Sequence, residues 1–195
     1  MMKERFYSVM VVNSSPSLCS EIPRLFPETG FYPVKTVTSG VLARRAGLFR
    51  TFDIVLVNAP LADDNGLSLA LDMAQNTLSS VLLLVPPSLY GSAAQSVKGS
   101  GVYVLRKPLP FSLLETSVSF MCASCDRMEL LEERRMKTEE KMEEIKLISR
   151  AKLVIMEDMH LGEEEAQRYI LRKAMDRSIS KKDAAADIIN AHRPL

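Results

Sequence analysis

The sequence has no surplus of charge of either sign, because 25 Lys and Arg residues balance 24 Asp and Glu residues. A net charge near zero gives the chain no overall field, so a nucleic-acid partner would have to meet a local patch. No segment approaches the run of about 18 apolar residues that a membrane span requires, and the first apolar run is too short for a signal peptide. We therefore expect a cytoplasmic protein without a membrane partner.

Cysteine is also scarce, and this scarcity argues against a fold held together by disulfides. Cys19, Cys122 and Cys125 do not make a paired framework, which agrees with a reducing compartment. Cys122 and Cys125 have Cys-x-x-Cys spacing, but no second cysteine pair or histidine is close in the sequence, so packing is the better interpretation. A glycine-rich phosphate loop, a nucleophile elbow and paired carboxylates are absent from the sequence as well. The sequence predicts no metal, no cofactor and no enzyme.

Five apolar runs recur at similar intervals, each followed by a plausible helix: residues 7–12, 31–37, 54–57, 81–85 and 102–105. Because these runs are continuous and do not alternate with polar residues, the strands should be parallel and covered on both faces. Pro23 should kink or shorten the first helix. The sequence thus predicts an α/β domain with a five-stranded parallel sheet over residues 1–120.

The third apolar run ends in Asn58, directly before Ala59 and Pro60. The ends of such strands are where open α/β sheets place their chemistry, and we expect this side chain to emerge into a loop. A carboxylate there would bind a metal or accept a phosphoryl group, whereas an amide is neutral and poorly nucleophilic. Asn58 marks either a lost active site or a structural cap.

The five βα units resemble a two-component receiver domain, which has a flavodoxin-like fold. The family pattern places an acidic pair after strand one, a phosphorylated aspartate after strand three, Ser or Thr after strand four and Lys-Pro after strand five. The matching positions here are Asn13 and Ser14, Asn58, Val85, and Lys107 with Pro108. Only the last pair follows the pattern. The resemblance therefore implies a pseudo-receiver that is controlled independently of aspartate phosphorylation.

The chemistry of these side chains leads to the same expectation. Magnesium is usually bound through one or two carboxylates, and Asn13, Ser14 and Asn58 supply none. Phosphoryl transfer needs a nucleophile as well as cationic stabilisation, and Lys107 alone is half of such a site. Lys107 is instead expected to donate to Asn58 or to backbone carbonyl groups.

The composition changes after Phe120, where residues 121–144 become rich in charged side chains and contain no Gly or Pro. A broken apolar seam runs along this segment through Met121, Cys125, Met128, Leu131, Met142 and Ile145. We interpret the segment as a coiled-coil stalk that forms a homodimer. A solvated helix in a monomer is the alternative, because Arg135 and Thr138 interrupt the seam.

Residues 145–195 predict three helices around a small core. The first continues to Met159, the second begins with acidic residues after Gly162, and Ser180 with Asp183 opens the third. Alanine and isoleucine at helical spacing should form the core: Ala151, Ile155, Ala166, Ile170, Ala174, Ala185 and Ile189.

This unit resembles the ANTAR domain, the three-helix RNA-binding module of response-regulator antiterminators. The matching positions are Ala151-Lys152, Met156, Glu165-Ala166, Ala174-Met175, and Asp183 with Ala185. Two positions depart from the pattern. Gly162 replaces a frequent Ser, and Gln167 replaces an aromatic residue, so any base stacking would have to use Tyr169.

Basic residues cluster over the second helix and its junction with the third: Arg168, Arg172, Lys173, Arg177, Lys181 and Lys182. Arg168 and Arg172 are one turn apart with Tyr169 nearby, a combination suited to single-stranded RNA loops. Lys152 matches the Ala-Lys step of the family, although its stem can also extend along the core. A solvated helix face is the alternative from the residues alone; the resemblance favours RNA contact.

Together the two resemblances imply a dimeric transcription antiterminator whose partners are paired hairpin loops of leader RNA. In place of phosphorylation, control would come from a regulatory protein on the receiver-like domain, or from synthesis alone. The alternative function is a protein-interaction scaffold without RNA binding, which Gln167 keeps open.

Overall fold

The computed structural model describes residues 5–191, and the chain divides into two compact units, Met1–Glu129 and Leu130–Leu195. The predicted domain limits of 1–120 and 145–195 include residues 1–4 and 192–195, which lie outside the described residues. The division into a stalk at 121–144 and an RNA-binding domain after it remains a prediction.

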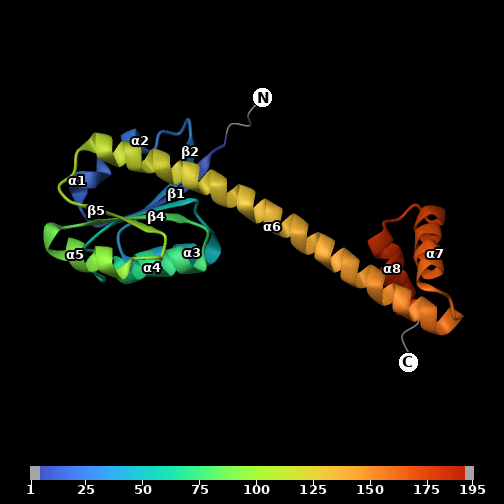
Figure 1. The fold of residues 1–195 in the computed structure, drawn as a ribbon. Coiled ribbons are helices and arrows are strands. Elements are labelled where there is room, and N and C mark those ends of the chain that lie inside the picture. The colour runs from blue at the N-terminus through green and yellow to red at the C-terminus, as the bar shows by residue number, and fades with distance from the viewer. Residues whose placement is uncertain (1–4, 192–195) are drawn as a thin grey trace. The chain divides into compact units, whose positions relative to one another are not determined.

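The first unit is built on one parallel sheet with the strand order β2-β1-β3-β4-β5 (Figure 1). The five strands coincide with the five apolar runs: β1 (Tyr7–Asn13), β2 (Phe31–Val37), β3 (Ile54–Asn58), β4 (Ser80–Val85) and β5 (Val102–Arg106). Every position of β3 and β4 is buried, as expected where helices cover both faces. The predicted receiver-type, flavodoxin-like fold is confirmed.

Helices cover the two faces of this sheet as separate layers (Figure 1). One layer consists of α3 (Gly40–Phe49), α4 (Leu67–Asn76) and α5 (Pro87–Ser96), and the other of α1 (Pro16–Cys19), α2 (Ile22–Leu25) and the beginning of α6 (Phe111–Met159). The predicted effect of Pro23 is confirmed, since the first helical segment is broken into α1 and α2, and Pro23 lies in the first turn of α2.

Helix α6 is 49 residues long and continuous. Its first turns pack on the sheet through Leu114, Val118, Met121 and Cys125. Met121 and Cys125, which the sequence placed in the stalk seam, are therefore core residues of the first unit, and the exposed apolar side chains of the seam begin at Met128. None of the helices within residues 5–191 is both long and apolar enough to cross a membrane.

The second unit contains the end of α6, α7 (Glu163–Asp176) and α8 (Lys181–Ala191). All seven predicted core residues are buried, and Ala184 and Ile188 join them. The predicted helix starts are also present, because the Gly162 N–H donates to Glu165 Oε2 at 3.0 Å and the Asp183 N–H donates to Ser180 Oγ at 3.0 Å. Small alanines in this core permit close approach of the three helices.

Candidate functional site

The carboxyl ends of β1 and β3 bring Asn13 and Asn58 together as register partners. Both side chains are buried, and Asn58 Nδ2 donates to Asn13 Oδ1 at 2.8 Å. Lys107, which follows β5, donates to Asn58 Oδ1 at 2.7 Å and to the Ala59 carbonyl at 2.6 Å. Asn58 thus points into a hydrogen-bonded network and not into an open loop, which corrects the sequence expectation for this side chain.

The remaining groups at this edge are also occupied. Asn13 Nδ2 donates to the Ser15 carbonyl at 2.7 Å, and Asn13 Oδ1 accepts from the Ser15 N–H at 3.0 Å. The Ser14 hydroxyl donates to the Pro60 carbonyl at 3.4 Å, and Val85 is a buried apolar side chain. Burial lowers the pKa of Lys107, which donates to two neutral oxygens. The site is a neutral amide network with one cation.

No group of three metal-ligating side chains occurs within the part of the chain that the structure describes. At this edge, the positions that would hold an acidic pair and a phosphorylated aspartate carry two amides and a hydroxyl. Such donors are weak ligands for magnesium, and an amide is a poor phosphoryl acceptor. These side chains instead form hydrogen bonds with one another, with Lys107 and with the neighbouring backbone.

The loop that follows β3 is tied to helix α3. Asp63 accepts hydrogen bonds from the N–H groups of Gly40 and Val41 at 2.9 and 3.0 Å, at the amino end of α3. Asp64 forms an ion pair with Arg44 of the same helix at 3.0 Å. Gly66, with φ of 82°, ends this loop at a place where an added Cβ would lie 2.9 Å from Ala59 Cβ. The loop beside the amide network is therefore fixed by specific contacts.

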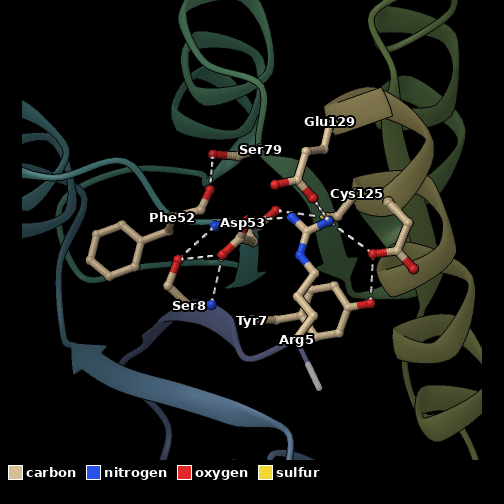
Figure 2. Close-up of polar contacts among 9 residues, drawn as sticks. Arg5, Tyr7, Ser8, Phe52, Asp53, Ser79, Cys125 and Glu129 are labelled. Atoms are coloured by element: carbon tan, nitrogen blue, oxygen red, sulfur yellow. Dashed lines mark hydrogen bonds and ion pairs between the residues drawn. The ribbon is translucent and has the colours of Figure 1, made fainter. Parts of the chain in front are cut away.

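A second polar network lies at the opposite edge of the sheet, where Asp53 precedes β3 (Figure 2). Asp53 Oδ2 accepts from the Ser8 N–H at 2.8 Å and from Ser8 Oγ at 2.6 Å, and Asp53 Oδ1 pairs with Arg5 at 3.0 Å. Arg5 also pairs with Asp126 at 2.8 Å and with Glu129 at 2.5 Å on α6. This network attaches α6 to the sheet.

The contacts of this second network determine the direction in which the pKa values of Asp53 and Cys125 shift. Burial alone would raise the pKa of Asp53, but the hydrogen bonds from Ser8 and the Arg5 guanidinium outweigh it and lower the pKa. Burial raises the pKa of the neighbouring Cys125 thiol to about 11, and Cys125 Sγ donates to the Asp53 carbonyl at 3.2 Å. Cys125 is a packed thiol that stays protonated near neutral pH, as the sequence indicated.

In the second unit, α7 presents three of the predicted RNA-binding side chains together. Arg168, Tyr169 and Arg172 line one shallow cavity of about 310 Å³ with Leu161 and Glu165. All three are exposed, because Ala166, Ile170 and Ala174 form the buried side of α7. One ring and two guanidinium groups therefore line the same cavity on the exposed face of the helix.

A second cavity of about 460 Å³ adjoins the first, since Arg168 lines both. It brings Lys152 of α6 next to Gln167 and Arg168 of α7. Lys152 forms an ion pair with Glu163 at 2.7 Å, and its side chain is 19% exposed. The surface that runs over Lys152, Gln167, Arg168, Tyr169 and Arg172 is called the α7 strip below.

The other predicted basic residues lie outside these two cavities. Arg177 pairs with Asp187 at 2.8 Å, and Lys182 with Glu143 at 3.4 Å. Within residues 5–191, no ion pair holds Arg172, Lys173 or Lys181. The three glutamates at the start of α7 also line these two cavities, and the sequence did not indicate a role for them at the site.

Comparisons with known proteins give a family for the second unit and a fold for the first. Residues 136–189 match the ANTAR domain family, a range that includes the last part of α6, all of α7 and most of α8. Among curated proteins, none matches the chain.

Several solved structures share the fold of the first unit. The signal receiver domain of an HD domain-containing protein from Pseudomonas fluorescens Pf-5 is 16% identical with a TM-score of 0.56, covering 69% of this chain and 96% of that one. A response regulator receiver domain protein from Clostridium thermocellum is 19% identical with a TM-score of 0.54, covering 65% and 99%. A structure described as adenylate cyclase from Rhodopirellula baltica is 18% identical with a TM-score of 0.57, covering 69% and 98%. At these identities the shared property is the fold.

Proposed function

We propose that this protein is an RNA-binding transcription antiterminator that acts on hairpin loops of leader RNA. The chain joins a receiver-type fold to an ANTAR domain, as response regulators of the ANTAR type do. The observation that carries this proposal is the α7 strip, where cations and one aromatic ring share an exposed face. We propose no catalytic role for this chain.

The α7 strip has the chemistry that an unpaired RNA loop requires. Guanidinium groups bind phosphate oxygens, and the Tyr169 ring offers a face on which an unstacked base can lie. Arg172 has no ion pair to break within the described residues, so its charge is available to a phosphate. Lys152 would first have to exchange Glu163 for RNA. Arg172 and Tyr169 should therefore contribute more to binding than Lys152.

Control of this regulator is independent of aspartate phosphorylation in our proposal. The amide network of Asn13, Asn58 and Lys107 supports this step, because it has neither a phosphoryl acceptor nor carboxylates for magnesium. A protein partner on the first unit would supply the signal instead.

Dimerisation through α6 would allow two ANTAR domains to engage two hairpins. The helix exposes apolar side chains beyond the sheet, including Met128, Leu131, Met142 and Ile145. Burying such a seam against a second copy removes apolar surface from water. Two linked domains then raise the effective concentration for the second hairpin, so weak contacts to each loop suffice.

The test is binding of the full-length protein to a two-hairpin leader RNA across a salt series, with Arg172→Ala and Tyr169→Ala beside it. We expect each variant to lose about 1–3 kcal/mol of binding free energy, and Arg172→Ala also to reduce the salt dependence by about one unit of slope. Arg134→Ala, an exposed cation on α6, is the matched control and should bind as the unchanged protein does. Equal binding by all four proteins would contradict the α7 strip as the RNA surface.

A scaffold without RNA binding is the second candidate, favoured by Gln167 and by the Lys152–Glu163 ion pair. Both features reduce what the α7 strip offers to RNA, because one removes a ring and the other neutralises a cation. The same titration separates the two functions. Absence of binding even at low salt would support the scaffold.

A further inference from the structure

Helix α3 carries its large apolar side chains on the outside. Its buried face is made of small residues, Gly40, Ala43 and Ala46. Val41, Leu42, Leu48 and Phe49 are 65%, 44%, 85% and 82% exposed. An amphipathic surface helix ordinarily has the reverse arrangement, with its large apolar side chains facing the core. The outward stripe on α3 is therefore left largely uncovered by the rest of the first unit.

This stripe borders a groove beside the edge strand β2. The groove has a volume of about 290 Å³ and is lined by Lys35, Val37, Leu42, Arg45, Ala46 and Phe49. Buried Val37 and Ala46 form its floor, and the exposed Leu42 and Phe49 stand at its side. The six residues are called the β2–α3 groove below. Its size suits one or two apolar side chains, the anchors of a helix laid on another surface.

The charge around the β2–α3 groove has one sign. Its lining includes Lys35 and Arg45 and no carboxylate. Within residues 5–191, neither side chain takes part in an ion pair, whereas the adjacent Arg44 pairs with Asp64 and Asp72. The structure thus neutralises the inner arginine of α3 and leaves the outer one available, in the middle of the apolar stripe.

We propose that the β2–α3 groove binds an acidic amphipathic helix of a regulatory protein partner. The proposal rests on the proposed function, for which it supplies the surface and the chemistry of the partner. Apolar anchors would fill the groove, and flanking carboxylates would meet Lys35 and Arg45. A second copy of this chain fits less well, because a two-fold contact through the same surface would bring like charges together. A bare phosphate backbone would leave Leu48 and Phe49 exposed.

The experiment uses the full-length protein and two fluorescent designed helical peptides. Both have Leu and Phe at i, i+3, i+4 and i+7, and they differ only in carrying Glu or Lys at the flanking positions. Fluorescence anisotropy should show the Glu peptide binding at least about tenfold more tightly than the Lys peptide, with an affinity that falls as salt is added.

Variants assign the binding to the groove. Phe49→Ser and Arg45→Glu should each weaken the Glu peptide about tenfold or more, and Lys35→Glu with Arg45→Glu should reverse the preference between the peptides. Leu78→Ser and Lys98→Glu, exposed positions of the first unit outside the groove, should leave both affinities unchanged. Thermal unfolding checks that each variant is folded, and Phe49 is exposed enough for its loss to leave the core intact.

Three outcomes would overturn the proposal. The first is that the two peptides bind with equal affinity or that neither binds. The second is that sedimentation shows a lower oligomeric state for Phe49→Ser than for the unchanged protein. The third is that the protein binds phosphatidylserine vesicles and does not bind the Glu peptide. RNA binding by Phe49→Ser is measured in parallel and should be unchanged. Failure of the groove is thereby distinguished from failure of the RNA-binding function.

Discussion

At the scale of one residue, Asn58 joins the ends of two neighbouring strands through its side chain. Its amide donates to Asn13 and accepts from Lys107, so the same strand ends are joined without any carboxylate. Buried polar groups that are fully paired hold a unique arrangement, whereas an unpaired one is costly. The sequence has no carboxylate at these two positions, and the structure adds that the amides bridge the strands.

Asn58→Asp tests whether the acceptor alone is missing. We expect no phosphoryl incorporation from acetyl phosphate and magnesium, because Asn13, Ser14 and Val85 still supply neither metal ligands nor a hydroxyl after β4. Intact-mass spectrometry measures the result. Asn13→Asp combined with Asn58→Asp is the comparison, since it adds a carboxylate for magnesium. Stoichiometric phosphorylation of the single variant would contradict this expectation, because it would show that an acceptor alone is enough for phosphorylation.

Asp53 makes the stability of the first unit dependent on pH. Its pKa is lowered in the folded protein, so its contribution is fully present above the unfolded value of about 3.9 and is lost as the pH falls through the lower folded value. Asp53→Asn should cost about 2 kcal/mol at pH 7, through weakened bonds to Ser8 and Arg5, and less as the pH falls below about 4.

Urea unfolding of both proteins between neutral and acid pH measures this difference. Glu115→Gln, an exposed carboxylate on α6 outside the network, is the control and should change stability little. A difference for Asp53→Asn that stayed constant with pH would contradict the assigned role of its charge.

Among the elements, strands were the most predictable and surface networks the least. Continuous apolar runs located all five strands, and Pro23 located the break between α1 and α2, because both signals are local. Arg5 and Glu129 are 124 residues apart in the sequence, and nothing near either residue indicates the other. The outward stripe of α3 was missed for a related reason. Its sequence contains both large and small apolar residues, and only the fold shows which of them face the sheet.

The stalk of α6 required a similar distinction between buried and exposed apolar residues. Met121 and Cys125 belong to the same series of three- and four-residue intervals as Met128 and Leu131, yet the sheet covers the first pair and not the second. Sequence periodicity alone could not separate packing within the unit from packing against a second copy. The surface left for a dimer therefore begins at Met128.

Met142→Glu combined with Ile145→Glu tests this part of α6. The two side chains are 53% and 64% exposed, so the change should leave the core of the second unit intact. Charge in the seam should produce a monomer in analytical ultracentrifugation. Its affinity for a two-hairpin RNA should fall to that for one hairpin, while one-hairpin binding is retained. Thr138→Glu, at an exposed interruption of the seam, is the control. A protein that is monomeric before any substitution would contradict the stalk.

At the scale of the whole molecule, the chain joins two modules whose chemistry is unequal. The first unit keeps the receiver-type fold but has an amide network where the phosphorylation chemistry would be. The second unit keeps the α7 strip on an ANTAR domain. The fold and the family could be predicted from the sequence, because apolar periodicity and alanine spacing are patterns among residues close together in the chain. The basic residues and Tyr169 of the α7 strip were also predicted from the sequence, whereas the placement of Lys152 beside them, the β2–α3 groove and the Arg5 network needed coordinates.

The most direct measurement is the affinity of the full-length protein for a two-hairpin leader RNA and for its single-hairpin halves, with and without acetyl phosphate and magnesium. We predict that the protein binds the two-hairpin RNA about 100-fold more tightly than either half. This affinity should fall as salt is added and should be unchanged by acetyl phosphate. Equal affinity for one and two hairpins, or binding that requires acetyl phosphate, would contradict a phosphorylation-independent dimeric antiterminator.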